Sequence, residues 1–353
     1  MRNAVSRIAA FSVAWLVFHL AVRGQHAAVH TIPARNVEQE LLVPVFIAER
    51  GPFWFAIDSG IARTLMDREV ATNAHLSVKE FAPFATTRLN IGGQEFQTAM
   101  ELRNLNVPEY QWASDQPLAG VLGMDFFQSF IVTLDYDAAV ITLQDPSLAF
   151  QPEGANAIPL TLRDSLPYIT AKMKLAGQPP GNPSFMLDTS TGDAINDGSF
   201  AHLGAKAVGP DLGRAEYLQI GPFRFSGVNG TSGPSKIGGE LLHRFLVTID
   251  APHRRLFLLP SRHFGDAFLF DTSGLDLERC PRGFNILRVF PRTPGQDSGL
   301  APGDVILSID GQPAALFPIT QVRLMFQEVA NHALFVDRNG AQLTITVKLR
   351  KLL

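Results

Sequence analysis

The chain has 353 residues, of which 46% are hydrophobic and 18% charged, a globular balance with ample material for buried cores and no sign of disorder. Its length predicts two or three domains. A net charge of −3 without a basic patch argues against nucleic acid as a partner, and the single cysteine, Cys280, excludes an internal disulfide.

Residues 1–24 have the composition of a secretory signal peptide. Arg2 and Arg7 precede the uncharged apolar segment 8–22, and small residues follow. A membrane anchor is the alternative, but about 20 apolar residues are needed to cross a bilayer and this segment is shorter. We therefore expect export to the periplasm, the cell surface or the medium; whether the segment is cleaved, or left as an uncleaved membrane anchor, stays open.

The first lobe is expected over residues 36–148, after a polar, loose stretch from Gln25 to Gln39. Residues 41–47 and 53–57 have the composition of strands, and Gly51-Pro52 separates them. The second of these strands ends at Asp58. Further along the chain we predict a helix over 66–76, a hairpin turn at Gly92-Gly93, and two strands at 131–136 and 139–143.

Residues 146–157 are a plausible connector to a second lobe at 149–262, which repeats the plan of the first. Asp188 ends an apolar run, Phe185 to Leu187, as Asp58 does. Other segments of the first lobe have similar sequences in the second lobe, in the same order. Residues 75–76 match 202–203, residues 89–92 match 218–221, and residues 120–135 match 235–250. Self-similarity at a long offset marks duplicated structural units. We infer two homologous lobes that each contribute one Asp.

Two facing Asp residues define a specific chemistry. Carboxylates brought together across a pseudo-twofold axis cannot both ionise near neutral pH, so they share one proton. The ionised partner takes a proton from water and the protonated one donates to a carbonyl oxygen. Ser59 and Thr189 supply hydroxyls for the backbone or the opposite loop, and Gly60 allows close approach.

These motifs, over residues 40–260, resemble the retropepsin-like, pepsin-related aspartic proteases in a tandem single-chain form. The resemblance implies a mainly β fold, with two homologous retropepsin-like lobes forming a pepsin-like bilobal unit. It implies an aspartic-type endopeptidase with the dyad Asp58 and Asp188 and no metal or cofactor. Supporting residues would be Ser59, Gly60, Thr189 and Ser190 in the loops, and Leu122, Gly123, Ile237 and Gly238 in hydrophobic-glycine turns. Flaps would fall near 81–88 and 209–216.

Two residues depart from the family pattern. Ser190 stands where the family has glycine, and Ile61 where a small residue is usual. A side chain at Ser190 can crowd the dyad, because any Cβ there restricts backbone angles and the distance between the lobes. Gly192 can compensate by shifting the turn. A catalytically silent, peptide-binding or scaffold homologue is therefore the alternative to an active enzyme.

The last segment, 268–353, resembles a PDZ domain of the bacterial exported type, a small β-rich domain with one or two helices. The resemblance rests on Gly299-Leu300-Ala301-Pro302-Gly303-Asp304-Val305-Ile306 followed by Ile309-Asp310-Gly311. It implies capture of a peptide, such as a C-terminal one, by strand addition. Four residues resemble the carboxylate-binding loop: Gly283, Phe284, Asn285 and Ile286. The alternative is a scaffold domain that packs on the lobes.

Other hydrolase classes fit less well. Gly230 to Pro234 has some similarity to the nucleophile loop of trypsin-like serine proteases, but it lacks the second glycine after the serine and a convincing upstream histidine. Paired Asp turns are not typical of glycosidases. Asp135 and Asp250 also repeat but close strands before turns, so we assign them to structure. No zinc-ligand spacing occurs around His75 or His202.

Overall fold

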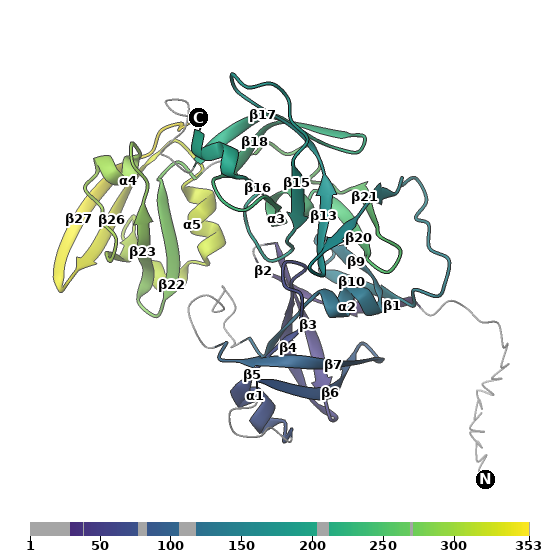
Figure 1. The fold of residues 1–353 in the computed structure, drawn as a ribbon. Helices are drawn as coiled ribbons and strands as arrows, with labels where there is room; N and C mark the ends of the chain where they lie inside the picture. The colour runs from purple at the N-terminus through teal and green to yellow at the C-terminus, as the bar shows by residue number, and fades with distance from the viewer. Residues whose placement is uncertain are drawn as a thin grey trace, which may run out of the picture.

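The computed structural model describes residues 29–37, 39–76, 83–105, 118–202, 212–268 and 271–352. The fold is mainly β, as predicted, with strands in separate sheets and short helices (Figure 1). The predicted signal peptide lies outside the described residues, as do parts of both predicted flaps. Within the described ranges no helix has the length and apolarity needed to cross a membrane.

Lobe 1 is a seven-stranded sheet in the order β2-β3-β4-β8-β5-β7-β6, with an extra β3–β6 pairing. Its β3–β4 hairpin turns at Ala48 and Glu49, which both have positive φ, as a tight two-residue hairpin requires. Gly51-Pro52 therefore lies inside β4 and not between strands, which corrects the sequence interpretation. The elements are β2 (Arg35–Val37), β3 (Glu40–Ile47), β4 (Arg50–Ile57), β5 (Leu65–Asp67), α1 (Arg68–Asn73), β6 (Phe84–Ile91), β7 (Gln94–Arg103), β8 (Gly120–Leu122) and α2 (Met124–Ser129).

Lobe 2 repeats the same pairing pattern strand by strand. β15 and β19 pair in parallel as β4 and β8 do, and β17 and β18 form a hairpin as β6 and β7 do. The counterpart of β3 is broken in two, β13 and β14, so this sheet has eight strands. The elements are β12 (Thr161–Arg163), β13 (Leu166–Thr170), β14 (Lys172–Leu175), β15 (Ser184–Leu187), β16 (Ile195–Asn196), η2 (Gly198–His202), β17 (Leu212–Ile220), β18 (Phe223–Thr231), β19 (Lys236–Ile237) and α3 (Gly239–Leu242).

A six-stranded sheet joins the two lobes, in the order β1-β10-β9-β20-β21-β11 (Figure 1). At its centre β9 and β20 pair antiparallel, and Thr133 lies directly opposite its own repeat, Thr248, with 2.8 Å between the hydroxyl oxygens. The approximate twofold axis passes through this pair. The strands are β1 (Val29–Pro33), β9 (Ile131–Asp135), β10 (Val140–Gln144), β11 (Ile158–Pro159), β20 (Phe245–Asp250) and β21 (Arg255–Pro260).

The prediction of a loose stretch over residues 25–39 is wrong in part, because this stretch contains β1 and β2. β1 pairs with β10 along five residues, and Ile32 is buried in the core that both lobes share. The sequence did not reveal β1 because its apolar content is low. An edge strand needs only one buried side chain and a free edge of a neighbouring strand to pair with.

The C-terminal unit forms a separate sheet with its own apolar core, beside lobe 2 in Figure 1. The strand order is β22-β23-β24-β26-β27, and β25 pairs with β24. The elements are β22 (Leu275–Cys280), β23 (Gly283–Val289), α4 (Pro294–Asp297), β24 (Val305–Ile309), β25 (Gln312–Pro313), η4 (Ala314–Leu316), α5 (Ile319–Met325), β26 (Asn331–Arg338) and β27 (Ala341–Lys348).

The segment that leaves lobe 2 toward this unit is anchored by a buried cation. Arg244 is 1% exposed, and its guanidinium donates to the carbonyl oxygens of His263, Asp266 and Ala267 and lies over the ring of Phe268. Burying a guanidinium is costly unless its donors are satisfied. The chain is therefore fixed on lobe 2 as far as residue 268.

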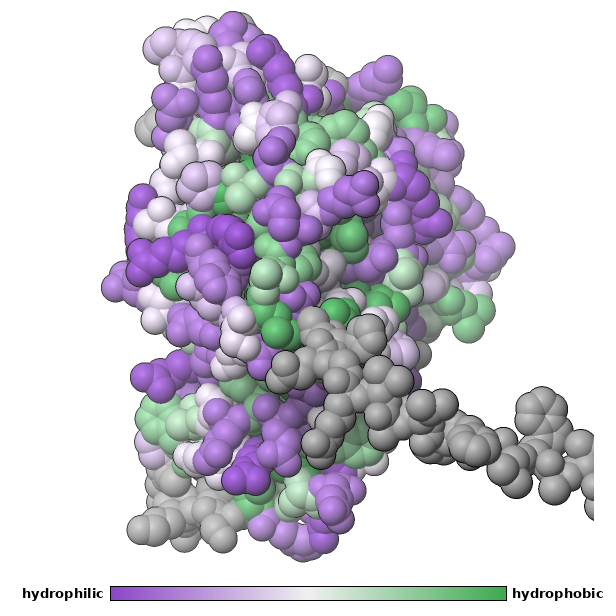
Figure 2. Space-filling model, turned by 90° about the vertical axis from the view of Figure 1, so that its right-hand side faces the viewer, coloured by the Kyte–Doolittle hydropathy of each residue, from purple (hydrophilic) through white to green (hydrophobic). Residues whose placement is uncertain are grey.

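One face of the molecule, seen in Figure 2, is mixed in character. Hydrophilic side chains dominate it, and apolar ones occur singly or in small groups between them. Scattered exposed apolar side chains are normal for folded proteins and are not by themselves evidence of a binding surface.

Candidate active site

Each predicted catalytic loop is held by the hydrophobic-glycine turn of its own lobe. Asp58 N donates to Leu122 O at 3.0 Å, and Asp188 N donates to Ile237 O at 2.9 Å. Beyond the Asp, Ile61 O and Thr191 O accept from the residues after the two glycines. The strand therefore continues its ladder into the loop and gives the Asp a rigid backbone.

Glycine is required at both turns because another chain segment crosses there. A Cβ at Gly123 would lie 2.6 Å from the carbonyl carbon of Arg63, and one at Gly238 would lie 2.4 Å from Asp193 O. Contacts this short do not occur for real Cβ atoms, so only glycine lets the loop lie on the turn. Leu122, Gly123, Ile237 and Gly238 thus lie where the sequence placed them, under the loops.

Ser59 and Thr189 tie the two loops together reciprocally. Ser59 N donates to Thr189 Oγ1 at 3.0 Å, and Thr189 Oγ1 donates to Ile57 O at 2.8 Å. In the other direction, Thr189 N donates to Ser59 Oγ at 3.2 Å, and Ser59 Oγ donates to Leu187 O at 2.7 Å. All four bonds are buried and cross the seam between the lobes, so each hydroxyl fixes the opposite loop.

Replacing Thr189 by Ala should destabilise the protein by roughly 2–4 kcal/mol, because it leaves the Ser59 N–H and the Ile57 carbonyl buried without partners. Thr189→Ser, which keeps the hydroxyl, should retain most of the stability. Urea unfolding at constant m-value measures the difference. Equal midpoints for the two variants would show that these bonds do not hold the lobes together.

The two carboxyl groups lie on either side of Gly60. Gly60 N donates to Asp58 Oδ1 at 2.6 Å, while the position of a Cβ on Gly60 is 2.7 Å from Asp188 Cγ. Asp58 is 8% and Asp188 3% exposed. The structure therefore brings together the two predicted dyad residues, in a buried position at the end of β4 and β15.

This environment changes the acidity of one member of the pair. Burial, followed by the nearby charge of Asp188, raises the pKa of Asp58 to about 7, although hydrogen bonds from Gly60 and Ser190 and the charge of Lys236 act in the opposite direction. Below about pH 7 the proton therefore stays mainly on Asp58, while the oxygens of Asp188 accept hydrogen bonds from Ser190 and Lys236. A protonated acid beside a carboxyl group that accepts hydrogen bonds is the arrangement that acid–base hydrolysis uses.

Ser190 contacts both carboxyl groups. Its N and Oγ donate to Asp188 Oδ1 at 3.2 and 2.9 Å, and its hydroxyl also lowers the pKa of Asp58, so it lies between the two groups. Ile61 is half-buried against the apolar cluster of lobe 1 and adds no polar contact of its own side chain. The departure at Ser190 adds a hydrogen-bond donor to the dyad.

Sequence reasoning missed a third charged residue at this site. Lys236 Nζ lies 2.7 Å from Asp188 Oδ2. The repeat contained the signal, because Val121-Leu122-Gly123 aligns with Lys236-Ile237-Gly238 and a lysine there replaces a buried valine.

The four residues predicted for a carboxylate-binding loop do not form a loop. Gly283, Phe284, Asn285 and Ile286 open β23, which pairs with β22 on one side and β24 on the other. Phe284 and Ile286 are buried, and the Ile286 N–H donates to Asp304 O. Their backbone groups are thus engaged, and the open edge of this part of the sheet is β22.

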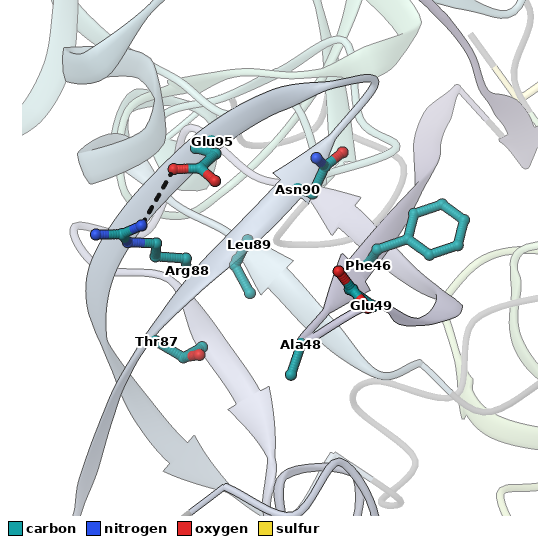
Figure 3. Close-up of a pocket in the computed structure, with 8 residues that line it drawn as sticks. All are labelled: Phe46, Ala48, Glu49, Thr87, Arg88, Leu89, Asn90 and Glu95. Atoms are coloured by element: carbon teal, nitrogen blue, oxygen red, sulfur yellow. Dashed lines mark ion pairs between the residues drawn. The ribbon is translucent and has the colours of Figure 1, made fainter.

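An open hollow of about 720 Å³ lies on lobe 1, away from the dyad (Figure 3). It is lined by the β3–β4 hairpin on one side and by β6 and Glu95 on the other, where Arg88 and Glu95 form an exposed ion pair at 3.5 Å. The hairpin turn at Glu49 and Asp58 occupy opposite ends of β4, roughly 30 Å apart along an extended strand. The hollow is therefore not part of the dyad site.

Among the described residues, no group of three or more His, Cys, Asp or Glu side chains is arranged to hold a metal ion.

Comparison with known proteins does not assign the chain to a family. No family model matches it, and no curated protein matches it. Among solved structures, the PDZ domain of HtrA3 bound to a phage-derived ligand (FGRWV) is 20% identical, covers 22% of this chain and 82% of that domain, and has a TM-score of 0.20. An aminopeptidase N family protein from Idiomarina loihiensis is 18% identical, covers 24% of this chain and 15% of its own, with a TM-score of 0.22.

Proposed function

We propose that this protein is an exported aspartic-type endopeptidase whose dyad is Asp58 and Asp188. The observation that carries the proposal is the pair of buried carboxyl groups flanking Gly60, with the pKa of Asp58 raised to about 7. The duplicated sheets and the crossed hydroxyl bonds support it, because they place one Asp from each lobe at a rigid seam.

The proposed reaction uses one proton and one water. Asp188 removes a proton from water, the oxygen attacks the peptide carbonyl carbon, and Asp58 donates its proton to the carbonyl oxygen. The tetrahedral diol then collapses: Asp58 takes a proton from one diol hydroxyl, the C–N bond breaks, and Asp188 gives the proton it took from water to the leaving nitrogen, so both acids return to their starting state. No covalent intermediate forms, and the reaction yields a new carboxylate and a new amine.

A pH series on a peptide library, with and without a pepstatin-type inhibitor, tests this function. Cleavage should be fastest below pH 7 and should fall as the pH rises above it, because Asp58 then loses its proton. A statine hydroxyl mimics the tetrahedral intermediate, so the inhibitor should stop cleavage. Cleavage that continues unchanged above pH 9, or in saturating inhibitor, would assign it to another mechanism.

We further propose that the C-terminal unit is a PDZ-like domain that binds an extended peptide at the edge of β22. β22 pairs only with β23 among the described strands, and α5 contacts it. The N–H of Ser273, in the turn that leads into β22, donates to Asp271 at 2.6 Å. Because that donor is already used, an internal segment fits better than a chain-terminal carboxylate. Hydrogen exchange on the full-length protein should show new protection in β22 when peptide binds.

A catalytically silent peptide-binding protein is the second candidate. It is favoured by the contacts of Asp188, whose oxygens already accept from Ser190 and Lys236. Saturable peptide binding without cleavage between pH 3 and 9 would decide for this alternative.

A further inference from the structure

Resting on the proposed function, we propose that Lys236 is a positioning residue that fixes the negative charge of the dyad on Asp188 and leaves the proton on Asp58. The two acids then have fixed roles: Asp188 is the base toward water, and Asp58 is the acid toward the substrate carbonyl. The dyad is thereby made asymmetric within an otherwise symmetric pair of lobes.

The geometry places Lys236 in a rigid strand. β19 lies between β15 and β16, with Lys236 opposite Met186 on one side and Asn196 on the other. This pairing holds the backbone of Lys236, and its side chain is 31% exposed while that of Asp188 is 5% exposed. The bond of 2.7 Å from Nζ to Asp188 Oδ2 is a charge-assisted hydrogen bond whose acceptor is buried and whose donor is partly exposed.

The two oxygens of Asp188 have different partners. Oδ1 accepts from the N–H and hydroxyl of Ser190, within its own loop. Oδ2 accepts from Lys236, on the neighbouring strand. Asp58 Oδ1 likewise accepts from its own loop, through Gly60 N. The lysine is therefore an addition to a contact pattern that the two loops otherwise share.

Lobe 1 has no counterpart of this cation. The equivalent position is Val121, 1% exposed, which packs with Ala56 and Leu65 in the apolar cluster of that lobe. A valine offers no hydrogen bond and no charge to Asp58. Because an opposite charge within about 4 Å favours the ionised form, the lysine on one side only selects which carboxyl group keeps the proton.

The other charges that reach the dyad act differently. Burial raises the pKa of Asp58 most, and of the charged groups near it Asp188 raises that pKa further and Lys236 lowers it. Beneath the loops lie Tyr136 and Glu40, both buried, and the charges of Glu40 and Asp188 raise the pKa of Tyr136, after the larger effect of burial. Lys236 is thus the cation that acts on this pair among the described residues.

The test is a carboxyl titration of the full-length protein followed by ¹³C NMR, with Asp58→Asn used to assign the signals. In Lys236→Val, which copies lobe 1, the Asp58 signal should change in two partial steps in place of one, because the two carboxyl groups then share the proton. In Lys236→Arg, which keeps a cation, the Asp58 signal should keep its single step, with a midpoint within a few tenths of a unit. Lys174→Val removes a surface ion pair with Glu216 in the same lobe and should leave the midpoint unchanged.

The pH–rate profile gives the second readout. Both limbs should move to higher pH in Lys236→Val, since removal of a cation raises both macroscopic pKa values of a coupled pair. If Lys236→Val does not fold, Lys236→Gln replaces it, because glutamine keeps a polar stem of similar length. A single, full Asp58 step in the folded variant, as in the unmodified protein, would overturn the role of Lys236. The titration does not depend on catalytic turnover. If the protein cleaves no peptide, the proposed function fails, but the titration still shows whether Lys236 fixes the position of the proton.

Discussion

Replacing Asp58 by Asn should lower peptide cleavage by about 10³-fold or more, because the dyad loses the group that protonates the carbonyl oxygen. Asp188→Asn should be equally damaging, since it removes the base that activates water. The measurement is kcat/KM on the best peptide from the library at its optimal pH. Because the two groups act as a unit, the double variant should be hardly worse than either single one.

Asp135→Asn is the matched control. This Asp lies outside the dyad and accepts a hydrogen bond from Ala138 N in a turn, which asparagine can also accept. Its activity should be that of the unmodified protein. Full cleavage by purified Asp58→Asn would exclude the dyad as the source of activity.

The same substitution at Asp58 should stabilise the fold at high pH. The pKa of Asp58 is about 7 in the folded state against 3.8 for the ordinary side chain, so folding takes up a proton between these values. The free energy of unfolding should therefore rise as the pH falls from about 7 to about 4 through this group. Asp58→Asn removes that dependence and should add stability, on the order of a few kcal/mol, at pH 8.

Gly60→Ala should abolish activity by crowding the dyad. Its Cβ would lie 2.7 Å from Asp188 Cγ and 2.8 Å from Oδ2, so the carboxylate has to move. Overpacking of this kind costs roughly 1–3 kcal/mol in stability. A displacement of about 1 Å at a reacting group costs about 100-fold in rate, so we expect at least that loss of kcat/KM.

Gly192→Ala is the control for this change. It lies in the opposite loop region, two residues after Ser190, and a Cβ there would meet nothing within 4 Å. Stability and activity should therefore stay close to those of the unmodified protein. Equal activity of the two alanine variants would show that contact between Gly60 and Asp188 does not matter for function.

The pairing of the two Asp turns was predictable because it is carried by local patterns that occur twice. An apolar strand that ends on Asp58, and its copy ending on Asp188, need only strand composition and self-similarity to be recognised. The glycines under the loops were predictable for the same reason. These glycines let two backbone segments approach closely. Because only glycine allows this, the positions can be recognised in the sequence.

Features that depend on tertiary contacts were not predictable. The strand β1 has one fully buried residue, Ile32, and owes its existence to a free edge of β10 more than 100 positions later. The ion pair between Lys236 and Asp188 joins two strands that are neighbours only in the folded sheet. The error at Gly283 has a similar source, because a glycine in a hairpin and one in a ligand-binding loop have the same local sequence signal.

The crossed bonds of Ser59 and Thr189 have a consequence for how the sequence can change over generations. Each half of the chain carries the hydroxyl that orients the other half's acid, so neither copy is free to diverge at these positions on its own. A gene that arose by doubling is thereby kept as an obligate pair. Its two halves behave as subunits of a dimer whose stoichiometry is guaranteed by the peptide bond between them.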